Sequence, residues 1–144
     1  MSEIPYNELM EKLQKLLRNT LIHFKEVKVC IVFGSVAAGK ASPRSDLDIA
    51  VAGEQPLSED VFLKLMEAFS ESANRDIDLI DLMAVSGPIL KKALTTGRII
   101  LNRDKTLYAS LMSRMLFNEA DMMPYYHRTL RERRRRFLNG QGSH

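Results

Sequence analysis

The segment Val29-Cys30-Ile31-Val32-Phe33-Gly34-Ser35 is followed, after ten residues, by Asp46-Leu47-Asp48, and these two stretches decide the fold. Apolar runs over 27–33 and 47–52 predict two strands, the first covered on both faces. Alternate strand residues point to one face, so Asp46 and Asp48 should lie side by side, which is costly without a neutralising cation. A Gly-Ser turn after a strand offers N–H groups and a hydroxyl to phosphates. Together these features predict a nucleotide site.

This spacing of Gly34-Ser35 and Asp46-x-Asp48 resembles the nucleotidyltransferase superfamily typified by DNA polymerase β, most closely its minimal nucleotidyltransferase (MNT) branch. Residues 75–82, Arg-Asp-Ile-Asp-Leu-Ile-Asp-Leu, look like the strand that carries the family's third carboxylate, and Asp78 holds the matching place. The resemblance covers residues 27 to 103. It implies that Asp46, Asp48 and Asp78 bind Mg²⁺ and catalyse transfer, with Asp78 helping to deprotonate the acceptor hydroxyl.

The resemblance also predicts a phosphate-binding side. In the family, arginines commonly follow the Gly-Ser pair, whereas this chain has Val36-Ala37-Ala38 there. Lys40 and Arg44 remain as candidate cations for the triphosphate. The full set of predicted nucleotide-binding residues is Gly34, Ser35, Lys40, Arg44 and Ser45.

Other interpretations of these residues stay open. Two acids at a strand start are often solvated surface groups, and in the third acidic segment Asp76 fits a strand-edge charge and Asp81 a loop-facing or capping acid. Residues 34–40 nearly form a P-loop, but Ala41 stands where Ser or Thr is needed and Pro43 interrupts the helix that should follow. The three histidines share no metal-ligand spacing, which argues against a zinc site.

The order of apolar patterns predicts an α/β fold, a small mixed β-sheet with helices on one side and a C-terminal helical extension. The predicted organisation is a core with an N-terminal helix over 1–103, the extension over 104–138 and a disordered tail over 139–144. Expected helices cover 6–24, 36–40, 58–72, 88–94 and 104–137, the last interrupted at Pro124, and expected strands cover 27–33, 46–52, 76–82 and 98–101.

Composition and charge narrow the class of protein. The 144 residues are 45% hydrophobic and 27% charged, with a net charge of +3. Residues Arg128 to Arg136 contain six arginines and one glutamate, so the remaining chain is acidic. This arginine run is either a solvated helix end or a docking surface for RNA or an acidic protein, and specific nucleic-acid binding is not implied. The single cysteine, Cys30, lies in an apolar run and should be buried.

The family resemblance implies a specific activity. Stand-alone MNT proteins are commonly antitoxins that transfer AMP from ATP to a tyrosine of a HEPN-domain ribonuclease toxin. We therefore expect a Mg²⁺-dependent transfer to a hydroxyl, a HEPN-domain partner and, since the chain shows no leader or membrane span, a cytoplasmic location. Two alternatives remain, a catalytically weak module that neutralises its partner by binding alone and a small-molecule nucleotidyltransferase.

Overall fold

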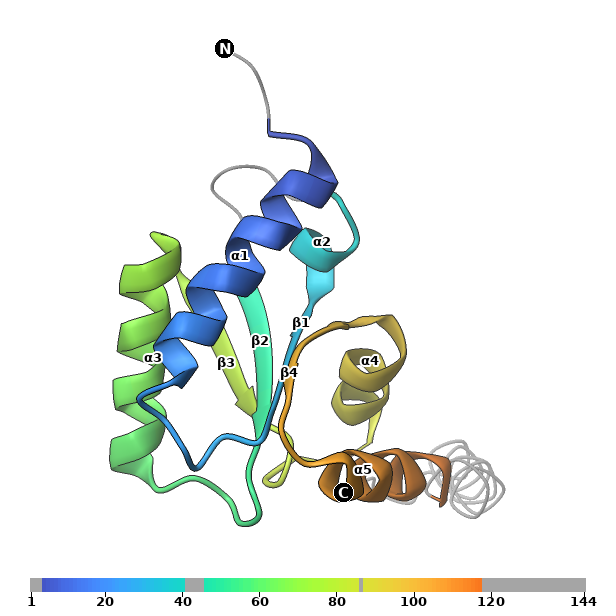
Figure 1. Cartoon of the computed structure of the whole chain (residues 1–144). Coiled ribbons are helices and arrows are strands. Elements are labelled where there is room, and N and C mark those ends of the chain that lie inside the picture. The colour runs from blue at the N-terminus through green and yellow to red at the C-terminus, as the bar shows by residue number, and fades with distance from the viewer. Residues whose placement is uncertain (1–3, 41–45, 86, 118–144) are drawn as a thin grey trace, which may run out of the picture.

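The sheet has four strands in the order β3-β2-β1-β4 (Figure 1). The computed structural model describes residues 4–40, 46–85 and 87–117, in which the strands are β1 (Val29–Phe33), β2 (Leu47–Ala52), β3 (Ile77–Asp81) and β4 (Arg98–Asn102). Strand β1 is antiparallel to β2 and β4, and β2 is parallel to β3. The predicted mixed sheet is confirmed, and the crossover between β2 and β3 is the expected helix.

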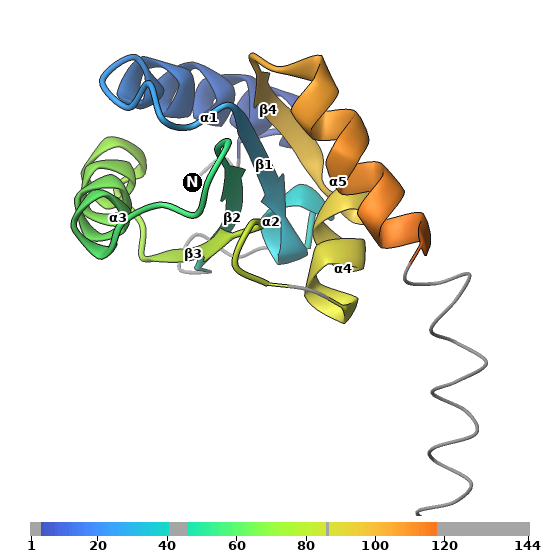
Figure 2. The ribbon, with the colours of Figure 1, turned by 90° about the horizontal axis from the view of Figure 1, so that it is seen from below.

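Helices cover both faces of this sheet, so the prediction of helices on one side was wrong. Helices α1 (Tyr6–Leu21) and α3 (Glu59–Ala73) pack on one face, while α4 (Pro88–Thr96) and α5 (Lys105–Phe117) lie on the other (Figures 1 and 2). All five residues of β1 are buried, and they alternate between the two layers. Cys30 and Val32 join the layer under α1 and α3, whereas Val29, Ile31 and Phe33 join the other.

Local signals set the helix ends. Ser58 precedes α3, and its hydroxyl accepts a hydrogen bond from the backbone N–H of Val61 at 3.2 Å, as an N-cap should. Asn74, at φ 52°, ends α3 in the left-handed conformation. Pro88 stands at the first position of α4. The N-terminal helix ends at Leu21, three residues earlier than expected, where the guanidinium of Arg103 donates to the Leu21 carbonyl at 2.8 Å.

The C-terminal prediction is tested only in part. Helix α5 begins at Lys105, one residue later than expected, and the description ends at Phe117. Pro124, the arginine run and the tail over 139–144 lie outside the described residues, so the division at 103/104 stays a prediction. Of the helices in the described ranges, none combines the length and apolar character that crossing a membrane requires.

Candidate active site

The sheet brings the Gly-Ser pair and the first aspartates together. In the antiparallel register Phe33, the last residue of β1, is paired with Asp48 of β2. Gly34 and Ser35 follow at once and begin the short helix α2 (Gly34–Ala37), two residues before the predicted helical turn. Strand β2 therefore begins at the end of the sheet where β1 ends, the upper end in Figure 1.

Gly34 is in direct contact with Asp48. It has a φ of +75°, and a Cβ at this position would lie 2.0 Å from Oδ2 and 2.9 Å from Cγ of Asp48. The space that any other side chain would fill is thus occupied by the Asp48 carboxylate. Glycine is required here by the backbone conformation and by this close approach.

Asp78 faces Asp48 across the parallel pair of strands. The two residues are register partners, and their side chains are hydrogen-bonded to each other. Burial raises the pKa of Asp48, and the neighbouring charge and hydrogen bond of Asp78 raise it further. The charge of Asp46 acts in the same direction, and that of Lys92 on α4 lowers the pKa. The site therefore holds acidic groups that repel one another when ionised.

These carboxylates suit a divalent cation, although they do not form a complete cage. Oxygen ligands are those that Mg²⁺ prefers, and it commonly uses only one or two protein carboxylates together with substrate phosphates. Asp46 is exposed and lies just before β2, beside residues 41–45, which are outside the description. Within the described ranges, no three His, Cys, Asp or Glu side chains gather closely enough to hold a metal ion. The Asp48–Asp78 pair is thus the part of the predicted triad that the fold assembles.

The two other acids of the third segment have different positions. Asp81 is buried, and its carboxylate accepts hydrogen bonds from the backbone N–H groups of Leu57 at 2.7 Å and Met83 at 2.9 Å. It ties the loop before α3 to the end of β3, in agreement with the capping interpretation. Asp76 is exposed just before β3. Neither acid is a register partner of Asp48.

Comparison with known proteins places this site in a family. The family described as "Polymerase beta, Nucleotidyltransferase" matches residues 11–106, which include β1 to β4 and every acid discussed above. The chain belongs to the polymerase β nucleotidyltransferase family. Both the mixed sheet and the enzyme class predicted from the sequence are confirmed by this membership.

One relative and two solved structures show how far the likeness extends. The chain is 28% identical over 100 residues to the protein adenylyltransferase MntA of Shewanella oneidensis, covering 68% of this chain and 70% of that one. A toxin–antitoxin crystal structure with AMP-PNP superposes with a TM-score of 0.62 at 23% identity, over 83% of this chain and 97% of its match. A chain of the complex of tri-AMPylated Shewanella oneidensis HEPN toxin with MNT antitoxin superposes with a TM-score of 0.58 at 20% identity, over 88% of this chain and 99% of its match. At these identities the two structures show a shared fold.

The residues predicted to bind phosphate are described only in part in this nucleotidyltransferase. Ser35 and Lys40 are exposed, whereas Arg44 and Ser45 lie outside the described residues. Val36 is buried in the core and contributes no polar group. The sequence did not predict a role for Lys92, whose charge lowers the pKa of Asp48. An exposed lysine on an amphipathic helix carries no signal of its own in the sequence.

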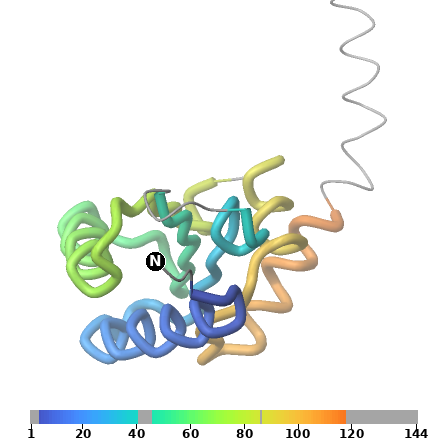
Figure 3. The backbone as a smooth tube through the Cα atoms, turned by 90° about the horizontal axis from the view of Figure 1, so that it is seen from above, coloured from blue at the N-terminus to red at the C-terminus, as the bar shows by residue number. Residues whose placement is uncertain are grey.

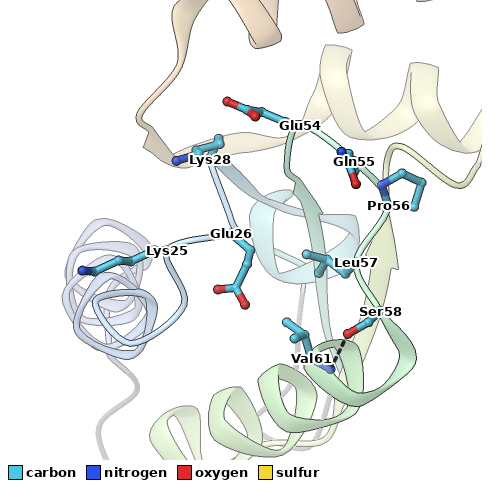
Figure 4. A pocket seen from close by; sticks show the side chains of 9 residues that line it. All are labelled: Lys25, Glu26, Lys28, Glu54, Gln55, Pro56, Leu57, Ser58 and Val61. Carbon is cyan, nitrogen blue, oxygen red and sulfur yellow. Dashed lines mark hydrogen bonds between the residues drawn. The ribbon is translucent and has the colours of Figure 1, made fainter.

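A pocket of about 570 Å³ lies at the other end of the sheet (Figure 4). It is formed where the chain enters β1 and where it leaves β2, far along both strands from the Phe33–Asp48 pair. Its charges are mixed, and Figure 4 shows Ser58 engaged in capping α3. The lining residues are Lys25, Glu26, Lys28, Glu54, Gln55, Pro56, Leu57, Ser58 and Val61. None of the predicted site residues is among them.

Proposed function

We propose that this nucleotidyltransferase is a Mg²⁺-dependent protein adenylyltransferase that moves AMP from ATP to a hydroxyl group. The observation that carries the proposal is the register pair Asp48–Asp78 beside Gly34. Strands β2 and β3 each supply one carboxylate to the same place in the sheet. Because Gly34 has no side chain, the Asp48 carboxylate can lie directly against the Gly-Ser pair. The relative named protein adenylyltransferase MntA supports AMP as the transferred group.

Each residue then has a role in the transfer. Asp48 and Asp78, with Asp46 from the strand entrance, would hold Mg²⁺, which neutralises these carboxylates and polarises the α-phosphate when bound. Asp78 is the more exposed of the register pair, so an acceptor hydroxyl can approach it and lose its proton to it. Gly34 and Ser35 would contact the phosphates, and the absence of a side chain at Gly34 keeps the Asp48 carboxylate in place.

The proposed acceptor is a tyrosine of a cognate HEPN-domain ribonuclease toxin, which makes the protein an antitoxin of the cytoplasm. The solved complex of an AMPylated HEPN toxin with an MNT antitoxin shares the fold of this chain and supports the choice of partner. ATP as the donor is supported by the toxin–antitoxin structure that contains AMP-PNP. The arginine run, with its local positive charge, is the proposed docking segment for an acidic surface of this partner.

The test is a transfer assay with labelled ATP, Mg²⁺ and a candidate HEPN-domain protein, sought first in the neighbouring reading frames. Label should appear on the partner, map to a tyrosine and coincide with loss of its ribonuclease activity. The double variant Asp48→Asn/Asp78→Asn should fold, bind the partner and transfer nothing. A double variant that silences the ribonuclease as well as the wild type does would show that binding alone neutralises the partner, and the proposal would be wrong.

A further inference from the structure

Among the described residues, Lys40 is the one cation that follows the Gly-Ser pair closely in sequence; its backbone N–H donates to the Ser35 carbonyl at 2.9 Å and its side chain is exposed. Where the family has arginines, this chain has Val36, which is buried, and Ala37 and Ala38, which carry no charge. A triphosphate carries several negative charges, and its pyrophosphate leaving group gains charge during transfer, so a nearby cation is needed for efficient chemistry. In the described part of the chain, any cation for the phosphates in addition to Lys40 has to come from another element.

Helix α4 brings a lysine to this place. It packs beside α2 and against β1, and Figure 3, which looks onto the end of the sheet that bears the site, shows α4 and α2 as neighbours. Three buried side chains, those of Leu90, Ala93 and Leu94, fix the face that α4 turns to the core. Lys92 lies between Leu90 and Ala93 in the chain and is exposed.

The charge of Lys92 acts on the catalytic acids. Among the described residues it is the cation that opposes the raised pKa of Asp48, so its ammonium group lies within electrostatic range of that carboxylate. No hydrogen bond or ion pair to a described residue holds this ammonium group in place. Lys91, the preceding residue, is also exposed, but it has an interaction of its own and is not a source of the effect on Asp48.

We propose that Lys92 binds the β- and γ-phosphates of the nucleotide and takes the place of the arginines that this chain lacks after Gly34-Ser35. The inference rests on the proposed nucleotidyl transfer at the same site. In the free protein the ammonium group offsets the charge of Asp48. Once Mg²⁺ neutralises these carboxylates, the flexible lysine is available as a point charge for the phosphates.

Equilibrium binding of three ligands, measured by calorimetry with Mg²⁺ and no acceptor, tests this role. Lys92→Met should weaken ATP and pyrophosphate about 10- to 100-fold, the range for loss of a hydrogen bond between charged groups. AMP has no β- or γ-phosphate, so its affinity should be unchanged. Lys92→Arg should recover most of the loss. Lys91→Met, which removes the same charge one residue away on α4, is the matched control and should bind all three ligands as the wild type does.

Three outcomes would overturn the proposal. Unchanged pyrophosphate affinity in Lys92→Met would mean that Lys92 only balances the acids. An equal loss for AMP would mean that it shapes the whole site, and an equal loss in Lys91→Met would mean that only the overall charge of α4 matters. Because the assay needs no acceptor, a wild-type protein that binds ATP but transfers nothing would refute the proposed function and leave the test of Lys92 decisive.

Discussion

Substituting Gly34 by alanine is the sharpest test of how the Gly-Ser pair and the acids work together. A Cβ at Gly34 would lie 2.0 Å from Asp48 Oδ2, and ordinary contact needs 3.4 Å or more, so the carboxylate would have to move by about 1.4 Å. Misplacing a reacting group by about 1 Å can cost about 100-fold in rate. We therefore expect Gly34→Ala to lose about 100-fold or more of the AMP transfer rate.

The loss of stability should be much smaller and is separable from the loss of activity. An alanine at φ +75° costs about 1–3 kcal/mol of the free energy of unfolding. Moving the partly exposed Asp48 side chain off its preferred rotamer adds about 0.5–1.5 kcal/mol. Gly87→Ala is the control for the contact with Asp48, because Gly87 also has a positive φ (+74°, with ψ −139°) and no atom lies within 4 Å of the position that its Cβ would take. It should show the backbone cost alone.

Both variants would be compared with the wild type by urea unfolding and by transfer of labelled AMP to the partner. Gly34→Ala should fold, be slightly less stable than Gly87→Ala, and be nearly inactive, while Gly87→Ala keeps most of its transfer rate. If the two variants transfer AMP equally well, the contact between Gly34 and Asp48 has no part in catalysis. The geometric reasoning would then be refuted.

Further predictions concern the acids and the arginine run. Asp48→Asn should abolish transfer and stabilise the metal-free protein near neutral pH. Folding raises the pKa of Asp48, so this carboxyl contributes stability at acidic pH, and the contribution is lost as the pH rises through the folded-state pKa. The melting temperature of the wild type should therefore lose this contribution toward neutral pH, whereas the melting temperature of the variant should not. Asp81→Ala should lower the free energy of unfolding by about 2–4 kcal/mol, because it leaves the N–H groups of Leu57 and Met83 without their acceptor. At a temperature where the variant is folded, its ATP affinity should match that of the wild type. A loss of ATP binding by the folded variant would assign Asp81 to the site. Replacing Arg133 to Arg136 by serine should slow association with the partner in stopped-flow measurements, and added salt should slow association of the wild type similarly. Metal-dependent ATP binding by the variant should be unchanged. Association of the variant at the wild-type rate would make the run a solvated helix end.

The sequence by itself determined the elements and the enzyme family. Strand β1 was evident from its apolar run, α3 from its Ser58 cap and α4 from Pro88, because each of these signals lies within a short window of the chain. The Gly34-Ser35 and Asp46-x-Asp48 spacing resembles the pattern of the nucleotidyltransferase family, and the family match over residues 11–106 confirmed it. Boundaries were less accurate, and α2 began two residues before the expected turn.

Only the tertiary structure decided how these parts face one another. Strand order and register made Asp78, not Asp81, the partner of Asp48, and placed the missing Cβ of Gly34 against that carboxylate. The position of α4 decides that the second face of the sheet is covered and that the charge of Lys92 acts on Asp48. These relations join residues about 14 to 44 positions apart in the chain, and they follow from which buried surfaces fit together, which no local pattern of residues encodes.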